Sequence, residues 1–240
     1  MKNLSLVTLV FAVLSVVFIL LLIFFRTPFG PYPLMSWQDA LDHLTPLVLI
    51  PLYWLLFKWS ASDAAGRMEE MAFMVLASVW TMGQGMHLSA NSVNNLAEGL
   101  AKKKTLDILS TDIYKLTYFY DEHLSHYLWH IGVLGLIALL VYREWRRPAG
   151  IATVWWAAGL GGLLYGFLYF CIFLEGQTVP LGLTFAAIFT LWALIWGRAR
   201  LARQPVLAFF SIAVLIALVL LGGWGIYWGG FPQFTDVGLM

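Results

Sequence analysis

Cysteine and charge are both scarce in this chain. Cys171 is the only cysteine among 240 residues, so neither an intrachain disulfide nor a cysteine-rich metal site can form. Charged residues make up 11% of the sequence, whereas a soluble domain carries about 25%. The formal net charge is +1, which gives no support for nucleic acid as a partner. These shortages exclude a disulfide-stabilised scaffold and an ordinary soluble domain.

Apolar residues fill most of the sequence instead. They account for 61% of it, and the twelve Trp and ten Tyr are typical of side chains that anchor at membrane interfaces. A helix that crosses a bilayer needs about 20 apolar residues. Runs of roughly that kind cover residues 4–25, 44–59, 68–92, 116–142, 151–174, 179–196 and 206–227. We therefore predict an all-α, multi-pass membrane protein whose residues 1–240 form a single domain of seven transmembrane helices.

The first run and the basic residues predict the orientation. The apolar run 4–25 is too long for a signal peptide, and Arg26-Thr27-Pro28 is a poor cleavage site, so we expect a retained helix. Seven spans place the termini on opposite sides. The N-terminal side then carries nine basic residues: Lys2, Lys58, Arg67, Arg143, Arg146, Arg147, Arg198, Arg200 and Arg203. The other side carries five: Arg26, Lys102, Lys103, Lys104 and Lys115. Because basic residues favour cytoplasmic loops, we predict a cytoplasmic N-terminus and a non-cytoplasmic C-terminus.

Ionisable side chains gather at one end of the predicted fourth span. Residues 118–130 hold three of the five histidines and lead directly into the apolar run 131–141. Antiparallel threading brings His43, at the start of the second span, and His87, late in the third, to the same end of the bundle. Glu175, at the end of the fifth span, falls there too. Ionisable groups at membrane depth are costly, so this end is the predicted functional site.

Helical periodicity predicts which of these side chains face one another. At about 100° per residue, one stripe of the fourth span contains Glu122, His123, His126 and His130. Asp121 points nearly opposite, so we expect it at the surface or at a helix start. A second polar stripe on the third span contains Gln84, His87, Asn91, Asn94 and Asn95. Because lipid would leave both stripes unsatisfied, we expect them to face each other inside the bundle.

This histidine pattern suits a metal ion. His126 and His130 have the i, i+4 spacing that lets two imidazoles bind one ion. His87 can add a third ligand, which with an open position is typical of catalytic zinc, and His123 is a further candidate ligand. Zinc is the first choice, but imidazole also suits copper and iron, and hydrogen-bonded interior histidines are the simpler alternative.

Two carboxylates are candidates for the catalytic role beside the ion. Glu122 stands one turn before His126, where it could orient an imidazole, bind the ion or act as the base on a bound water. Glu175 could be a fourth ligand or carry the proton. Of the two, Glu122 is preferred, because its placement depends on the geometry of one helix alone.

The segment His126-Tyr127-Leu128-Trp129-His130 resembles the HxxxH element of the CREST superfamily, which contains alkaline ceramidases and adiponectin-type receptors. The resemblance implies seven helices, zinc held by three histidines, and hydrolysis of a lipid amide. His126 and His130 match cleanly, whereas His87 matches an earlier family histidine more loosely. The family has this element in its last helix, whereas here three spans follow it, and Gly83 replaces a family Ser. The matching part covers under a tenth of the chain.

Taken with this resemblance, these patterns favour an integral membrane metalloprotein that has an intramembrane His/Glu site near the non-cytoplasmic face and hydrolyses a lipid amide or ester. One alternative is a membrane redox subunit that binds copper, iron or haem through the same histidines. Another is a non-enzymatic transporter or a subunit of a membrane complex, with the polar stripes forming an ion path. Membrane lipids are the expected partners, and other membrane subunits are further candidates.

Overall fold

Helices make up the fold. The computed structural model describes residues 3–25, 27–32, 34–102 and 107–239, and within these ranges there is no β-strand beyond two isolated bridges. The longer helices are α1 (Leu4–Ile19), α3 (Leu44–Trp59), α4 (Arg67–Lys102), α6 (His126–Arg146), α7 (Trp155–Glu175), α8 (Val179–Trp192) and α9 (Pro205–Trp228). Shorter helical pieces are η1 (Leu21–Phe24), α2 (Trp37–Asp42), α5 (Asp112–Tyr118), η2 (Phe119–Ser125), η3 (Ala193–Gly197) and η4 (Leu201–Arg203). The predicted all-α class is confirmed.

Several helices are long and apolar enough to cross a membrane. By length and composition, five segments qualify in the described part of the chain: Trp37–Trp59, Asp112–Arg146, Trp155–Glu175, Val179–Gly197 and Pro205–Trp228. The apolar helix α1 has 16 residues and is shorter than such a span. In contrast, α4 has 36 residues, which is about 54 Å at 1.5 Å per residue, but it is not among the qualifying helices. The described part of the chain therefore has five candidate spans, which is consistent with a membrane protein.

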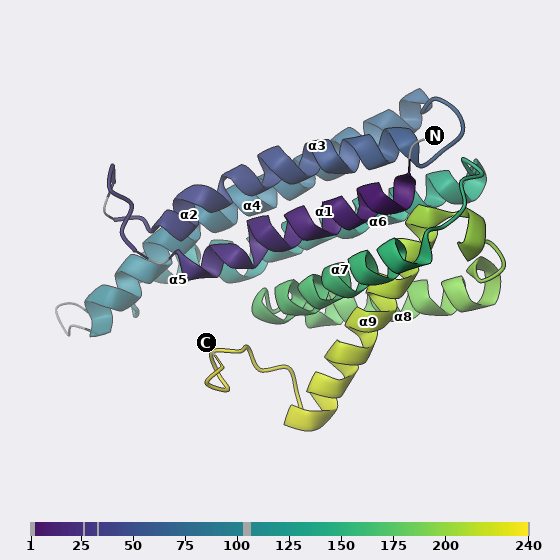
Figure 1. Cartoon of the computed structure of the whole chain (residues 1–240). Helices are drawn as coiled ribbons and strands as arrows, with labels where there is room; N and C mark the ends of the chain where they lie inside the picture. Colours follow the sequence, from purple (N-terminus) through teal and green to yellow (C-terminus); the bar gives the residue numbers. More distant parts are fainter. Residues whose placement is uncertain (1–2, 26, 33, 103–106, 240) are drawn as a thin grey trace.

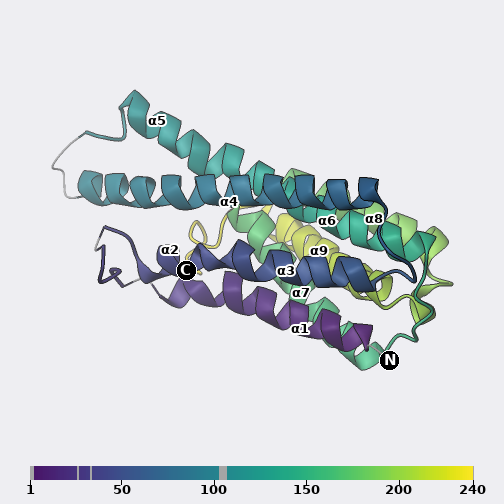
Figure 2. The same cartoon turned by 90° about the horizontal axis from the view of Figure 1, so that it is seen from above.

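The helices pack lengthwise into a bundle with two parts. Figure 1 shows α1, α3, α4 and α6 lying side by side, with α7, α8 and α9 below them and α9 crossing obliquely. The most extensive contacts join α7 to α9, α4 to α6, and α1 to α7. Seen from above, α5 lies beside the C-terminal half of α4 (Figure 2). The polar residues of α4 thus lie against α2, α5 and the start of α6.

Glycines let the backbones of α4 and α6 touch. A Cβ atom on Gly83 would lie 2.4 Å from the Trp129 backbone nitrogen and 2.6 Å from the Ser125 carbonyl oxygen. A Cβ atom on Gly132 would lie 2.7 Å from the Trp80 backbone nitrogen. Small residues at such crossings allow close helix packing in membranes. This contact fixes the rotation of α4 against α6 and turns His87, one helical turn after Gly83, toward the start of α6.

Charged residues close the opposite end of the bundle. The fully buried guanidinium of Arg143 binds Glu69 and donates to the Phe57 carbonyl oxygen at 3.1 Å. The buried carboxylate of Glu144 accepts hydrogen bonds from the backbone N–H groups that begin α9, at 3.2 Å and 2.7 Å. It therefore satisfies donors that a helix start leaves free. These contacts tie α3, α4, α6 and α9 together away from the histidines.

Candidate functional site

A π-helical segment, η2, connects α5 to α6 and carries the acidic residues of the site. Its hydrogen bonds skip one residue more than those of an α-helix, so each turn takes more residues and the side chains change face. As a result Asp121 is fully buried, whereas His123 is exposed. The sequence-based expectation that Asp121 faces away from the bundle interior is therefore wrong, because it assumed α-helical spacing through residues 119–125.

Asp121 is the partner of the histidine on α4. Its Oδ1 atom lies 2.8 Å from His87 Nδ1, and its Oδ2 atom accepts a hydrogen bond from Asn94 Nδ2 at 3.2 Å. The Asp121 carboxylate is 0% exposed, and the His87 side chain is 18% exposed. Both donors come from α4, so the pair joins α4 to η2 through a buried hydrogen-bonded carboxylate, the form in which charge is tolerated inside proteins.

Three of the predicted ligands lie together. The ring centres of His87 and His126 are 4.6 Å apart, and those of His126 and His130 are 6.0 Å apart with nearly parallel planes. The ring of Trp129 lies among them, 5.2 Å from His130 and between 6.1 and 6.4 Å from the other two. The close approach of α4 and α6 thus brings together three of the four imidazoles that the sequence predicted as ligands.

Each of these imidazoles is held through its Nδ1 atom. His87 uses the Asp121 carboxylate, His126 lies 3.1 Å from the backbone oxygen of Glu122, and His130 pairs with the Thr178 hydroxyl. An Nδ1–H group that donates to a carboxylate or carbonyl leaves the lone pair on Nε2. The Nε2 atom of His130 is buried and has no hydrogen-bond partner in the described part of the protein. For His87 and His126, whose Nδ1 atoms face a carboxylate and a carbonyl oxygen, this arrangement favours Nε2 as the acceptor or ligand.

The remaining predicted site residues lie farther out. His123 is exposed, with its ring 5.8 Å from that of Tyr118. Glu122 is half-buried, and its carboxylate accepts a hydrogen bond from Gln177 Nε2 at 3.3 Å. The carboxylate of Glu175 accepts a hydrogen bond from the Phe234 backbone N–H at 2.7 Å. Glu175 therefore holds the C-terminal segment against the end of α7.

The polar stripe of α4 faces α2 as well as η2. Gln84 donates to the Asp42 carboxylate at 3.1 Å and accepts from the indole of Trp80 at 2.7 Å. Farther along, Asn91 donates to Asp39 at 3.2 Å. His43 remains outside this group, exposed, with Nδ1 2.7 Å from the Asp39 backbone oxygen. Asp39 and Asp42 were not among the residues expected at the site, although the amides of the predicted polar stripe were a signal that such partners lie opposite them.

The turn between α7 and α8 covers the histidines from the other part of the bundle. A Cβ atom on Gly176 would lie 2.6 Å from His130 Cε1, so only glycine fits there without movement. Gln177 has a left-handed backbone with φ of 51°, an unusual conformation that often marks functional sites. Thr178 was missed from the sequence, because no local motif links it to a residue 48 positions earlier.

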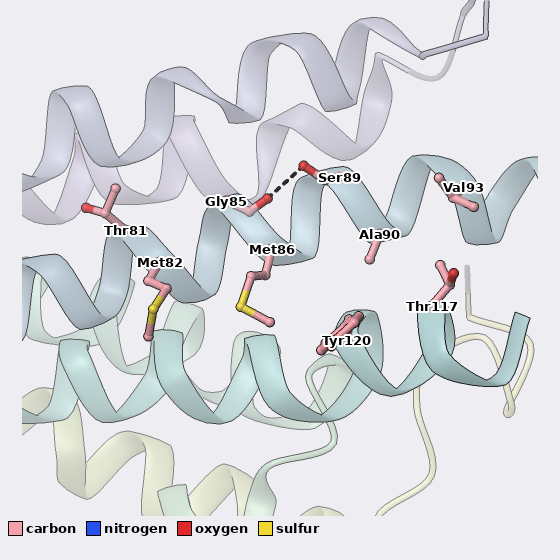
Figure 3. Close-up of a pocket in the computed structure, with 9 residues that line it drawn as sticks. All are labelled: Thr81, Met82, Gly85, Met86, Ser89, Ala90, Val93, Thr117 and Tyr120. Atoms are coloured by element: carbon pink, nitrogen blue, oxygen red, sulfur yellow. Dashed lines mark hydrogen bonds between the residues drawn. The ribbon is translucent and has the colours of Figure 1, made fainter. Parts of the chain in front are cut away.

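The histidines and carboxylates of the site do not line the two grooves described next. One groove of about 720 Å³ lies between α4 and the α5–η2 segment (Figure 3), and is lined by Thr81, Met82, Gly85, Met86, Ser89, Ala90, Val93, Thr117 and Tyr120. A second groove, of about 920 Å³, shares Thr81 and Met82 with it. Neither includes a histidine or a carboxylate, so both present an apolar surface rather than a reactive one.

The donor chemistry fits a metal ion better than the present spacing does. Three imidazoles with engaged Nδ1 atoms, one of them backed by a carboxylate, match the way histidine ligands are oriented in metalloproteins. However, within residues 3–25, 27–32, 34–102 and 107–239 no three His, Cys, Asp or Glu side chains are gathered as a metal site. No protein-family model matches the chain, and comparisons with curated proteins and with solved structures find no match.

Proposed function

We propose that the chain is a membrane metalloprotein in which His87, His126 and His130 bind one metal ion, with zinc as the first candidate. The observation that carries this proposal is the Nδ1 contact that each imidazole makes. With Nδ1 directed at a protein oxygen, Nε2 is the nitrogen available to an ion, and an oriented Nδ1 is the usual arrangement of a metal-bound histidine. Three protein nitrogens leave one position for water or substrate, as in catalytic zinc sites.

Two of the three ring separations are close to the value expected for a shared ion. Imidazoles that bind one tetrahedral ion through nitrogen, at about 2.0–2.1 Å, have ring centres roughly 5 Å apart. The two measured separations, 4.6 Å and 6.0 Å, lie on either side of that value. Because the side chains are not yet gathered as ligands, binding requires the rings to turn toward one another. Copper and iron remain candidates, because both accept imidazole ligands.

For the reaction we propose hydrolysis of an amide or ester bond in a lipid. A bound ion would polarise the carbonyl group and make a water nucleophilic near neutral pH. Within the chain, Asp121 orients His87, and Thr178 orients His130. Glu122, which is half-buried and held by Gln177, is the proposed group that accepts the proton of the attacking water. The substrate class follows from the membrane setting, since lipids reach a buried site from the bilayer.

Metal analysis of the purified protein tests the proposal. We expect about one equivalent of metal in the wild-type protein and its loss in His126→Ala and His130→Ala. His123→Ala is the matched control and should keep the metal, because that exposed ring lies away from the other three. An optical spectrum of the same sample separates the metals, since zinc is colourless whereas haem and cupric sites absorb. A metal-free wild-type protein would contradict the proposal.

A proton or ion path is a second candidate function, favoured by one observation. The buried Asp121–His87 pair and the Asp42–Gln84 contact line the same polar face of α4. Chains of such groups inside membrane proteins serve as proton routes. A metal-free protein whose reconstituted vesicles show proton flux, lost in Asp121→Asn, would place this function ahead of hydrolysis. A coloured metal site would instead favour the redox subunit.

We also propose that α1 and α4 complete a set of seven spans, with the N-terminus in the cytoplasm. The helix α4 is long enough for a span, and Glu69 and Glu70 in its first turn, with Lys102 in its last, lie near its ends. The predicted orientation depends partly on Lys2, Arg26, Lys103 and Lys104, which lie outside the described residues. Reporter fusions in successive loops test both statements.

A further inference from the structure

The C-terminal segment, residues 230–239, folds back from the end of α9 toward the rest of the bundle (Figure 1). Directly after α9, Gly229 has a left-handed backbone with φ of 67°, a conformation that favours glycine and turns the chain at a helix end. The Trp224 indole donates a hydrogen bond to the Pro232 carbonyl oxygen at 3.0 Å, and the ring of Phe234 lies 5.2 Å from that of Trp224. The segment therefore has a defined path against the last turns of α9.

This segment holds the end of α7. The backbone N–H of Phe234 donates to the Glu175 carboxylate at 2.7 Å, and the side-chain amide of Gln233 donates to the Glu175 backbone oxygen at 2.6 Å. The ring of Phe234 also packs against that of Phe170, with centres 5.7 Å apart. Because Glu175 is the last residue of α7, the C-terminal segment fixes both its side chain and its backbone.

The α7–α8 turn, residues 176–178, follows directly and covers two of the clustered imidazoles. A Cβ atom on Gly176 would lie 2.6 Å from His130 Cε1 and 3.4 Å from His126 Cγ, and the Thr178 hydroxyl pairs with His130 Nδ1. Thr178 and His130 are fully buried, and His126 is 5% exposed. A molecule that approaches the two rings from the end of α7 must therefore displace this turn.

The turn depends on outside contacts, because its own backbone conformation is unfavourable. Gln177 has φ of 51°, in the left-handed region that few residues other than glycine adopt. Such conformations persist only where the surrounding structure enforces them. One support is the hydrogen bond from Gln177 Nε2 to Glu122 at 3.3 Å, which is exposed to solvent. The contacts of the C-terminal segment with Glu175 support the other side of the turn.

We propose that the C-terminal segment is a strap that keeps the α7–α8 turn closed over His126 and His130, and that its release opens the way to the two rings. Gln233 and Phe234 are only half-buried, whereas α7 packs extensively on α9, so the segment can detach while the helices stay together. The inference goes beyond the proposed function, because a cover controls access to the rings whether they bind a metal ion or carry protons.

Hydrogen–deuterium exchange of the detergent-solubilised protein, followed by peptide mass spectrometry, tests the strap. The double variant Gln233→Ala/Phe234→Ala removes the amide donor and the ring contact. Exchange reports local opening, so the amides of residues 176–178 should exchange about tenfold faster than in the wild type. This factor corresponds to about 1.4 kcal/mol, within the range of one hydrogen bond. The variant Thr235→Ala, at an exposed neighbour in the same segment, is the matched control and should exchange as the wild type does.

Other peptides of the same experiment distinguish local opening from unfolding. Peptides covering residues 80–88 and 128–136 report the contact between α4 and α6, and their exchange should not change. Wild-type exchange of residues 176–178 in the double variant would overturn the strap. If the double variant exchanges faster throughout, the milder variant Gln233→Ala decides, and wild-type exchange of its turn would overturn the strap in the same way.

Chemical modification of His130 measures access directly. Diethyl pyrocarbonate reacts with unprotonated imidazole nitrogen, and a chelator first removes bound metal from every sample so that no ion blocks the reaction. The rate at His130 should rise about tenfold in the double variant, in line with the opening of one hydrogen bond. The exposed ring of His123 should react equally in both proteins. An unchanged rate at His130 would contradict the access role of the segment.

Metal content of the untreated samples keeps this inference separate from the proposed function. Faster exchange of the turn in the double variant of a protein that purifies without metal would support the strap while the metalloprotein proposal fails. A metal-loaded protein whose turn exchanges equally in the wild type and the double variant would do the reverse.

Discussion

The variant Asp121→Asn gives the sharpest test of the site. It keeps the size and shape of the side chain but removes the charge that faces His87 Nδ1. The carboxylate has two polar contacts: one oxygen lies 2.8 Å from His87 Nδ1, and the other accepts a hydrogen bond from Asn94 Nδ2. An asparagine offers only one oxygen, so one of these nitrogen atoms must face an amide N–H group. We therefore expect His87 to lose its fixed orientation or its negative partner.

Two estimates of the size of this effect agree. A hydrogen bond to a charged group contributes about 1.5–3 kcal/mol. Loss of the partner behind a metal-binding histidine typically weakens metal affinity by about 10–100-fold, which is about 1.4–2.7 kcal/mol. The Asp121 carboxylate is fully buried and the His87 side chain is 18% exposed, so solvent screens the contact only weakly and the effect should lie within this range.

The measurement is a zinc competition titration of the detergent-solubilised protein with a chromophoric chelator. Asp112→Asn is the matched control, because that carboxylate lies one helix earlier with its side chain 99% exposed, and its affinity should equal that of the wild type. The same experiment tests the register of η2: a surface position, as α-helical spacing predicts, would give no effect. Wild-type affinity in Asp121→Asn would refute the role assigned to the buried pair.

Three further predictions concern the proposed general base Glu122, the contact between α4 and α6, and the membrane topology. Glu122→Gln should retain metal and lose roughly 10²–10⁴ in turnover, the usual range for a general base, and full turnover would remove Glu122 from the mechanism. Gly83→Ala should lower the free energy of unfolding by about 1–3 kcal/mol, because the added Cβ atom would lie 2.4 Å from a backbone nitrogen of α6. In the control Gly85→Ala, the added Cβ atom would have nothing within 4 Å, so this variant should raise the free energy of unfolding by up to about 1 kcal/mol. Similar melting temperatures for the two variants would contradict the helix packing described here. A reporter on the C-terminus should be non-cytoplasmic and one between α8 and α9 cytoplasmic, and reversed signals would overturn the orientation.

The apolar runs locate the helices well, because burial in lipid requires continuous hydrophobic segments whatever the packing. The expected span 44–59 corresponds to α3 (Leu44–Trp59), and the run 206–227 to α9 (Pro205–Trp228). The grouping of His87, His126 and His130 follows from antiparallel threading and from spacing within one helix. These inferences use only the order of the chain and the geometry of a regular helix.

The environment of each histidine could not be predicted in this way. The position of Asp121 depends on a switch of backbone hydrogen bonds in η2, which leaves no clear pattern in residues 119–125. Thr178 reaches His130 only because the α7–α8 turn folds over it. Both contacts depend on local backbone conformation, and side-chain periodicity carries no information about it.

The glycine contact between α4 and α6 has a consequence for motion. Backbones that touch at Gly83 and Gly132 cannot slide past each other without clashes, so we expect α4 and α6 to move together as one body. His87, His126, His130 and Asp121 all belong to this body or to η2 at its end, whereas Thr178 belongs to the other part of the bundle. A hinge motion between the two parts would therefore release His130 from its hydroxyl partner and leave the His87–Asp121 pair intact. Among the three imidazoles, only that of His130 would change its hydrogen-bond partner when the bundle opens or closes.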